Sequence, residues 1–175
     1  MHRLHLLRHA KSDPADRLED RERPLSRRGR EDARRVGAAL PAALGALDLV
    51  LCSSALRTRE TADLVLAGFL PPPRVLYEDA LYLAAHPALL RRLRRLGESD
   101  NSVLVIAHNP GLHQLALALA DTEARHYKAL ASGKFPTSAR ASFEVGVPWT
   151  MLGRSPHALS DYVTPKSPSP KSPSA

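Results

Sequence analysis

Hydrophobic residues along the chain gather in short runs of the length of a buried strand. The most regular run is Ser102 to Ala107, with Val-Leu-Val-Ile at its centre, and His2 to Leu7 and Leu47 to Leu51 resemble it. Continuous apolar runs of roughly four to eight residues are typical of strands buried on both faces. Two weaker stretches, Arg74 to Tyr77 and Ala141 to Val147, predict two further strands.

Between these runs the apolar positions follow a helical spacing. Ser26 is a candidate N-cap for a helix over about residues 28–44, where apolar residues recur at three- and four-residue intervals from Ala33 to Leu44. Three consecutive prolines, Pro71 to Pro73, would end a second helix. The further helices are predicted over about 55–69, 87–96 and 111–120.

Strands that alternate with helices predict an α/β fold. We expect a three-layer sandwich, with a mostly parallel central sheet and helices on both of its faces. The length of 175 residues suits a single domain, which we expect to span residues 1–163. Residues 164–175 repeat Lys-Ser-Pro and contain no core-forming residue, so the sequence predicts a disordered tail there.

The charge of the chain is dominated by arginine. Lys plus Arg is 25 and Asp plus Glu is 18, which gives a net charge of +7. The basic residues are interleaved with acids, which favours solvated helix faces. Attraction to an anionic substrate and weak nucleic-acid binding are the alternatives. Aromatic residues make up only 5%, too few for a platform on which single strands stack, so we expect no nucleic-acid partner.

Nothing in the sequence predicts a membrane segment or export. No apolar run approaches the ~20 residues that a membrane span needs, and the first residues lack the apolar core of a signal peptide. Cys52 is the only cysteine, so no intrachain disulfide can form. We therefore expect a cytoplasmic protein without a membrane partner.

Polar residues follow three of the predicted strands: Arg8-His9, Cys52-Ser53-Ser54 and His108-Asn109. Ligands of parallel α/β sheets bind at the carboxyl ends of the strands, so these residues are expected to converge. His9 is a candidate nucleophile because neutral imidazole, with a pKa of about 6.5, is available near neutral pH. Arg8 offers a planar set of donors that suits a phosphoryl group. For this pair alone, a structural histidine beside a surface arginine is the alternative.

A second arginine and a second histidine extend the pattern. Arg57 falls in the first turn of its predicted helix, where free N–H groups and the helix dipole favour an anion. Exposed arginines after an ordinary serine cap are the alternative there, and a helix start fixed by Pro110 and Gly111 is the alternative at His108. Together the residues supply a nucleophile, two arginine clamps and another imidazole, as phosphoryl transfer requires.

Metal and thiol chemistry fit the sequence less well. His2 and His5 would point to opposite faces of a strand, and no cysteine or carboxylate completes a metal set with His9. We expect neither a metal nor another cofactor. Cys52 is not followed by an arginine at the spacing of a cysteine-phosphatase loop, and a buried small hydrophobic residue is its better interpretation.

These motifs resemble the histidine phosphatase superfamily, which includes phosphoglycerate mutases and acid phosphatases. Arg8-His9-Ala10 resembles its Arg-His-Gly signature, with alanine in place of glycine. The other matching segments are Leu25-Ser-Arg-Arg-Gly29, Ser53 to Thr61, and Val105 to Asn109, in the order of the family. Arg23-Pro-Leu, Leu81-Tyr82-x-Ala84 and His-Asn-Pro-Gly are most similar to the short bacterial phosphohistidine phosphatase branch. The likeness spans about residues 3–165 and implies a phosphoglycerate mutase-like fold.

The resemblance also implies roles for individual residues. His9 would be the nucleophile that becomes phosphorylated, while Arg8, Arg57 and His108 would bind the phosphoryl oxygens. Asn109 would help to orient His108. Larger relatives carry an acidic proton donor between the second and third motifs, where Glu78 and Asp79 are the candidates. Glu78 is our choice. The alternatives are a solvated acidic pair at these positions and, from the resemblance to the short branch, a mechanism without a dedicated acid.

The implied activity is hydrolysis of phosphohistidine in a protein through a covalent intermediate on His9. A phosphatase of small phosphorylated metabolites makes the same demands on the four central residues and stays open. The third possibility is a catalytically silent phosphate-binding domain, although all four residues are present. The sequence does not fix the oligomeric state, and a monomer is our expectation.

Overall fold

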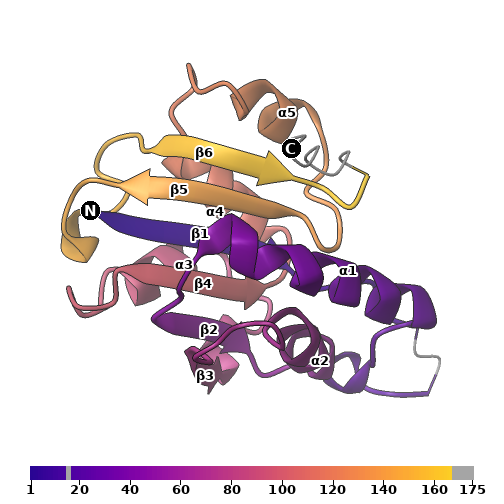
Figure 1. Ribbon diagram of the computed structural model, residues 1–175. Helices are drawn as coiled ribbons and strands as arrows, with labels where there is room; N and C mark the ends of the chain where they lie inside the picture. The colour runs from indigo at the N-terminus through magenta and orange to yellow at the C-terminus, as the bar shows by residue number, and fades with distance from the viewer. Residues whose placement is uncertain (15–16, 167–175) are drawn as a thin grey trace, which may run out of the picture.

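A single six-stranded sheet organises the computed structural model, which describes residues 1–14 and 17–166 (Figure 1). The strand order is β3-β2-β4-β1-β5-β6. The first four strands are parallel to their neighbours, β5 runs antiparallel to β1, and β6 runs antiparallel to β5. The predicted mostly parallel sheet is therefore confirmed. The strands are β1 (His2–Arg8), β2 (Leu49–Ser53), β3 (Arg74–Glu78), β4 (Ser102–Ala107), β5 (Arg140–Val145) and β6 (Ala158–Val163).

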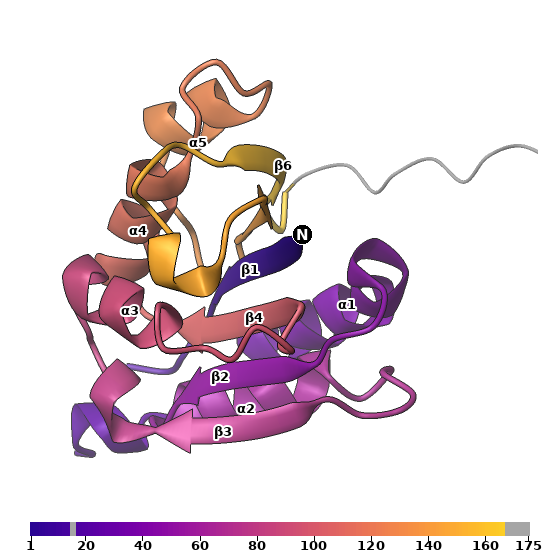
Figure 2. The same cartoon turned by 90° about the vertical axis from the view of Figure 1, so that its left-hand side faces the viewer.

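Helices cover both faces of the sheet, as the alternating pattern predicts. Figure 2 shows α3 and α4 on the side of the sheet opposite to α1. Side chains of β4 alternate between the two cores: Val103 and Val105 pack with α3 and α4, whereas Leu104 and Ile106 pack with α1 and α2. The helices are α1 (Arg27–Leu44), α2 (Leu56–Val65), α3 (His86–Leu93), α4 (Gly111–Leu119) and α5 (Tyr127–Ser132), with short 3-10 turns at Asp20–Glu22, Asp79–Leu81 and Trp149–Met151.

Local signals explain where α1 begins and ends. The Ser26 hydroxyl accepts a hydrogen bond from the Gly29 backbone N–H at 3.0 Å, so the predicted N-cap is confirmed. Gly45 follows the last turn with a φ of 67°, a conformation that glycine adopts without steric cost.

Two predictions about α2 need correction. The helix ends at Val65 instead of Phe69, and its N-cap is Ala55, which makes no side-chain cap bond. Of the two serines expected as caps, Ser53 accepts a hydrogen bond from a histidine and only a long one, 3.4 Å, from the Ala55 N–H. Ser54 donates to Asp79.

Two elements near the C-terminus were not predicted. α5 is six residues long, too short to show a helical period, and β6 is an edge strand with only one buried residue, Leu159. No helix within residues 1–14 and 17–166 is long and apolar enough to cross a membrane. Most of the predicted tail, residues 167–175, lies outside the described residues, so the tail stays a prediction.

Candidate active site

The carboxyl ends of β1, β2 and β4 meet at one edge of the sheet, beside the N-terminal turn of α2. A cavity of about 430 Å³ opens there. Five of the six residues chosen from the sequence line it together: Arg8, His9, Arg57, His108 and Asn109. The other lining residues are Lys11, Ser12, Asp20, Arg23, Leu83 and Thr137. The parallel sheet thus brings together motifs that lie up to about a hundred residues apart.

His9 is buried and held in one orientation. Its ring Nδ1 lies 2.7 Å from the carbonyl oxygen of Ala10, which can only accept, so Nδ1 carries the hydrogen and Nε2 keeps its lone pair. The Ala10 N–H donates to the Thr61 hydroxyl at 3.0 Å, which ties this loop to α2. Burial lowers the pKa of His9 to about 4, because the hydrogen bond to Ala10 offsets burial and the charges of Arg57 and Arg8 only in part. His9 is therefore a neutral imidazole at physiological pH.

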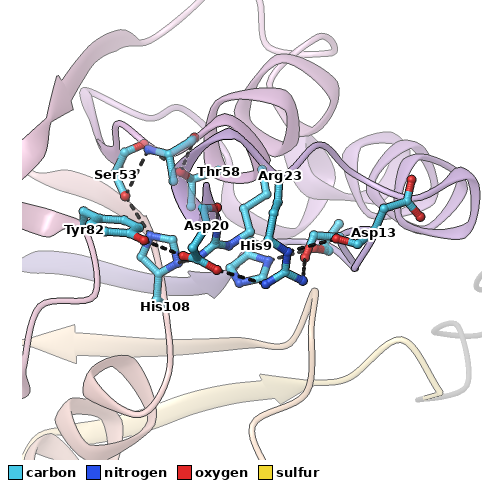
Figure 3. Close-up of polar contacts among 12 residues, drawn as sticks. His9, Asp13, Asp20, Arg23, Ser53, Thr58, Tyr82 and His108 are labelled. Atoms are coloured by element: carbon cyan, nitrogen blue, oxygen red, sulfur yellow. Dashed lines mark hydrogen bonds and ion pairs between the residues drawn. The ribbon is translucent and has the colours of Figure 1, made fainter. Parts of the chain in front are cut away.

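His108 has the opposite tautomer. Arg57 can only donate, and its guanidinium lies 3.4 Å from His108 Nδ1, so that nitrogen accepts. The Nε2–H then donates to the Ser53 hydroxyl at 2.7 Å (Figure 3). Burial lowers the pKa of His108 to about 3, with smaller contributions from His9 and Arg57. The two histidine rings lie 5.2 Å apart between centroids, on one side of the same cavity.

Arg8 and Asn109 share an anchor. Both donate to the carbonyl oxygen of Phe135, at 3.0 and 2.7 Å. Asn109 therefore fixes the segment that precedes β5, and no hydrogen bond from it to His108 is present among the described residues, contrary to our prediction. The Nε of Arg8 and the Oδ1 of Asn109 are buried, and neither has a hydrogen-bond partner among the described residues.

Asp20 is a site residue that the sequence did not reveal. Its carboxylate accepts hydrogen bonds from Arg23 at 3.0 Å and from the Tyr82 hydroxyl (Figure 3). It also accepts one from Arg57 at 3.0 Å. The Asp20 carbonyl accepts from Arg57 at 2.7 Å. The bond from Tyr82, with those from the two arginines, holds the pKa of Asp20 well below its usual range. In this structure the guanidinium of Arg57 is therefore paired with an ionised carboxylate.

The two acids expected to supply a proton do not line the cavity. Glu78 is bound by Arg92, with three contacts of 2.7 to 3.1 Å. Asp79 accepts from Ser54 at 2.5 Å and from Arg21 at 3.1 Å. The choice of Glu78 as donor is corrected on this geometry, because Asp20 is the only carboxylate among the described residues that line the cavity.

The cavity is strongly positive. Arg8, Arg23, Arg57 and Lys11 line it against the single carboxylate of Asp20. A pocket of this charge with planar guanidinium donors suits a tetrahedral oxyanion. Within residues 1–14 and 17–166, no three His, Cys, Asp or Glu side chains form a group that could hold a metal ion. Burial raises the pKa of Cys52 to about 12, so this thiol stays protonated inside the core.

Sequence comparisons agree with this geometry. The profile of the histidine phosphatase superfamily (branch 1) matches residues 4–81. An uncharacterized protein of Mycobacterium tuberculosis is 37% identical over 163 residues, which cover 91% of this chain and 100% of that protein.

Solved structures share the whole fold. A protein of Nakamurella multipartitia, assigned provisionally as the phosphohistidine phosphatase SixA, superimposes with a TM-score of 0.82 and 26% identity, covering 95% of this chain and 97% of that one. Its counterpart from Agrobacterium tumefaciens, with the same provisional assignment, gives a TM-score of 0.78 and 26% identity, covering 93% and 97%. The expected phosphoglycerate mutase-like fold is confirmed. With two histidines and two arginines at one sheet edge, the chain belongs to branch 1 of the histidine phosphatase superfamily and is a phosphatase.

Proposed function

We propose that this protein removes phosphate from phosphohistidine in a protein substrate, through a covalent intermediate on His9. One observation carries the proposal. The His9 Nδ1–H donates to Ala10, so the free lone pair of Nε2 is available in a cavity that Arg8, Arg23 and Arg57 line. A neutral imidazole held in one tautomer is ready to attack an electrophile without first losing a proton.

In the first step, the Nε2 lone pair of His9 forms a bond to phosphorus while the bond from phosphorus to the substrate nitrogen breaks. The substrate imidazole leaves with the electron pair of that bond and takes up a proton from solvent. Arg8 and Arg57 hold the non-bridging oxygens and offset the charge that spreads over them in the transition state. His108 would join them once it is protonated at Nδ1, the nitrogen that accepts from Arg57 in this structure.

In the second step, a water molecule attacks the phosphorus of phospho-His9. The bond between phosphorus and His9 breaks, orthophosphate leaves, and neutral His9 is restored. The water must give up one proton, and Asp20 is the candidate acceptor because it is the only carboxylate among the described residues that line the cavity. Loss of its bonds from Arg57 to the incoming phosphoryl group would make the carboxylate a stronger base. A phosphoryl group entering the site also has to replace Asp20 on Arg57, since both anions use the same guanidinium.

The protein substrate is favoured by the accessibility of the site. Lys11, Asp20 and Leu83 at its rim are all exposed, so a phosphorylated side chain on a protein surface could enter. The named structural neighbours, assigned provisionally as SixA phosphohistidine phosphatases, point to the same substrate. A lone cysteine that forms no disulfide suits the reducing cytoplasm.

The test compares the native protein with His9→Ala on an aryl phosphate and on a histidine-phosphorylated peptide, with a chelator present. We expect the native protein to cleave both substrates and the variant to cleave neither. Acid-labile, alkali-stable phosphate should be trapped on the native protein and should map to His9. Turnover by His9→Ala would refute the mechanism. Cleavage of the aryl phosphate alone would favour a small-metabolite phosphatase, and binding of phosphate without any turnover would favour a silent binding domain.

A further inference from the structure

A second cavity of about 300 Å³ adjoins the active site. We call it the basic groove and define it by Lys11, Arg28, Lys134, Thr137 and Lys166. Lys11 and Thr137 also line the catalytic cavity, so the two hollows share a wall. The groove lies between the first turn of α1, the segment that leads into β5, and the chain that follows β6.

The charge of the basic groove is largely unbalanced. Lys11, Lys134 and Lys166 are exposed, and none of them forms an ion pair within the described part of the chain. Asp32 is the one acid that lines the groove. Its carboxylate is already shared between Arg28, at 3.9 Å, and Arg35, at 3.1 Å. The four cations of the groove are therefore opposed by a single carboxylate, that of Asp32, which already forms ion pairs with two arginines.

A smaller, mostly apolar hollow of about 80 Å³ lies next to the basic groove along α1. Thr164 and Pro165 line both hollows, and Val36, Ala39 and Val163 are among the other residues that line the smaller one. From Arg28 to Ala39 the helix rises about 17 Å. An extended peptide covers that length with about five residues. The positive charge therefore lies in the hollow that adjoins the catalytic cavity, and the apolar hollow follows it along α1, in a line that a short extended segment could reach.

We propose that the basic groove binds an acidic segment of the protein substrate, next to the residue that carries the phosphate. The inference rests on the proposed function, because only a macromolecular substrate reaches beyond the catalytic cavity. The alternative occupant within this chain is the segment 167–175, but that sequence contains Lys171 and no acidic residue. Like charge disfavours it, whereas carboxylates in an extended segment would complement all four cations.

The experiment uses the full-length protein and two histidine-phosphorylated peptides of equal length. Beside the phosphohistidine, one peptide carries four glutamates and the other carries four glutamines. Each exposed ion pair contributes a factor of about two to three in binding, so we expect a KM at least ~10-fold lower for the acidic peptide at low salt. The ratio should shrink towards one in about 0.5 M salt, where such charges are screened. The kcat values of the two peptides should agree.

The variant Arg28→Gln, Lys134→Gln, Lys166→Gln removes three cations of the groove and leaves the catalytic cavity unchanged. We expect it to lose the preference for the acidic peptide while keeping its activity on an aryl phosphate. The matched control, Arg91→Gln, Arg95→Gln, Arg125→Gln, removes three exposed charges elsewhere on the surface and should keep the preference. This pair separates contact in the groove from attraction by net charge.

The inference alone would be overturned by equal KM values for both peptides with the native protein, or by equal loss of preference in both triple variants. Competition by a DNA oligonucleotide as strong as that by the unphosphorylated acidic peptide would also overturn it, because the groove would then bind any polyanion. Failure of the proposed function looks different. In that case the aryl phosphate is cleaved in a His9-dependent reaction but neither peptide is, and the groove inference falls with the protein substrate.

Discussion

Replacing Asp20 with asparagine keeps the size of the side chain and removes its charge. This carboxylate lies 3.0 Å from Arg57 and 3.0 Å from Arg23, with 44% of its side chain exposed. Inorganic phosphate has to compete with it for Arg57. We therefore expect Asp20→Asn to bind phosphate more tightly than the native protein does.

The size of the effect follows from the exposure of the pair. Partly exposed ion pairs contribute about 0.5 kcal/mol each, so two arginines released by the substitution give about 1 kcal/mol. That corresponds to roughly a fivefold lower inhibition constant for inorganic phosphate. If Asp20 also accepts the proton of the attacking water, kcat should fall on the order of 10²-fold. Phosphoenzyme should then accumulate, because the second step is the one that slows.

The assay is competitive inhibition of aryl phosphate hydrolysis by inorganic phosphate at pH 7, combined with a rapid-quench measurement of phosphoenzyme. Glu22→Gln is the matched control, since Glu22 belongs to the same 3-10 turn, is exposed and does not line the cavity. We expect the control to match the native protein. An unchanged or higher inhibition constant in Asp20→Asn would refute the competition for Arg57. An unchanged kcat would refute the role of Asp20 as the proton acceptor.

Three further predictions follow from the geometry of the site. Ser53→Ala removes the acceptor of the His108 Nε2–H. It should lower kcat/KM for an aryl phosphate about tenfold, because a buried donor left without a partner costs about 1–3 kcal/mol. A change below twofold would contradict the role of Ser53 in positioning His108. Gly29→Ala places a methyl group 1.9 Å from the Lys11 carbonyl oxygen and should destabilise the fold in urea by about 1–3 kcal/mol or more, whereas Gly146→Ala, with open space around it, should not. Burial lowers the pKa of His9 to about 4 and that of His108 to about 3, so below about pH 6.5 the unfolded chain binds more protons than the folded one. The free energy of unfolding should therefore fall by about 1.4 kcal/mol per pH unit for each histidine, down to its folded pKa. Urea midpoints that stay constant between pH 6.5 and 4.5 would contradict this.

Local sequence was sufficient for most of the elements and for the four central residues. Four of the strands alternate with helices, and the run 102–107 is identified as a buried strand by its short length and its β-branched residues. Arg8, His9, Arg57 and His108 were found because each lies at a strand end or helix start. Parallel strands necessarily place those positions at the same edge.

Long-range packing decided the rest of the site. Asp20 lies in a charged segment with no hydrophobic period, and its partner Tyr82 is 62 residues away, so no local pattern relates the two. Arg23 and Tyr82 belong to segments that carried the family resemblance, yet nothing in their sequence assigned them to this carboxylate. Glu78 sits where the sequence predicts an acid, but the fold places Arg92 against it instead of a substrate.

The sequence by itself determined which backbone segments form the sheet and its covering helices, and which strand ends carry the reactive side chains. The tertiary structure alone decided the proton and charge state of those side chains. A histidine tautomer depends on which oxygen or guanidinium it faces, as with Ala10 for His9 and Arg57 for His108. A pKa depends on burial and on charges from distant parts of the chain. Periodicity encodes neither, because both arise only when separate segments pack against one another.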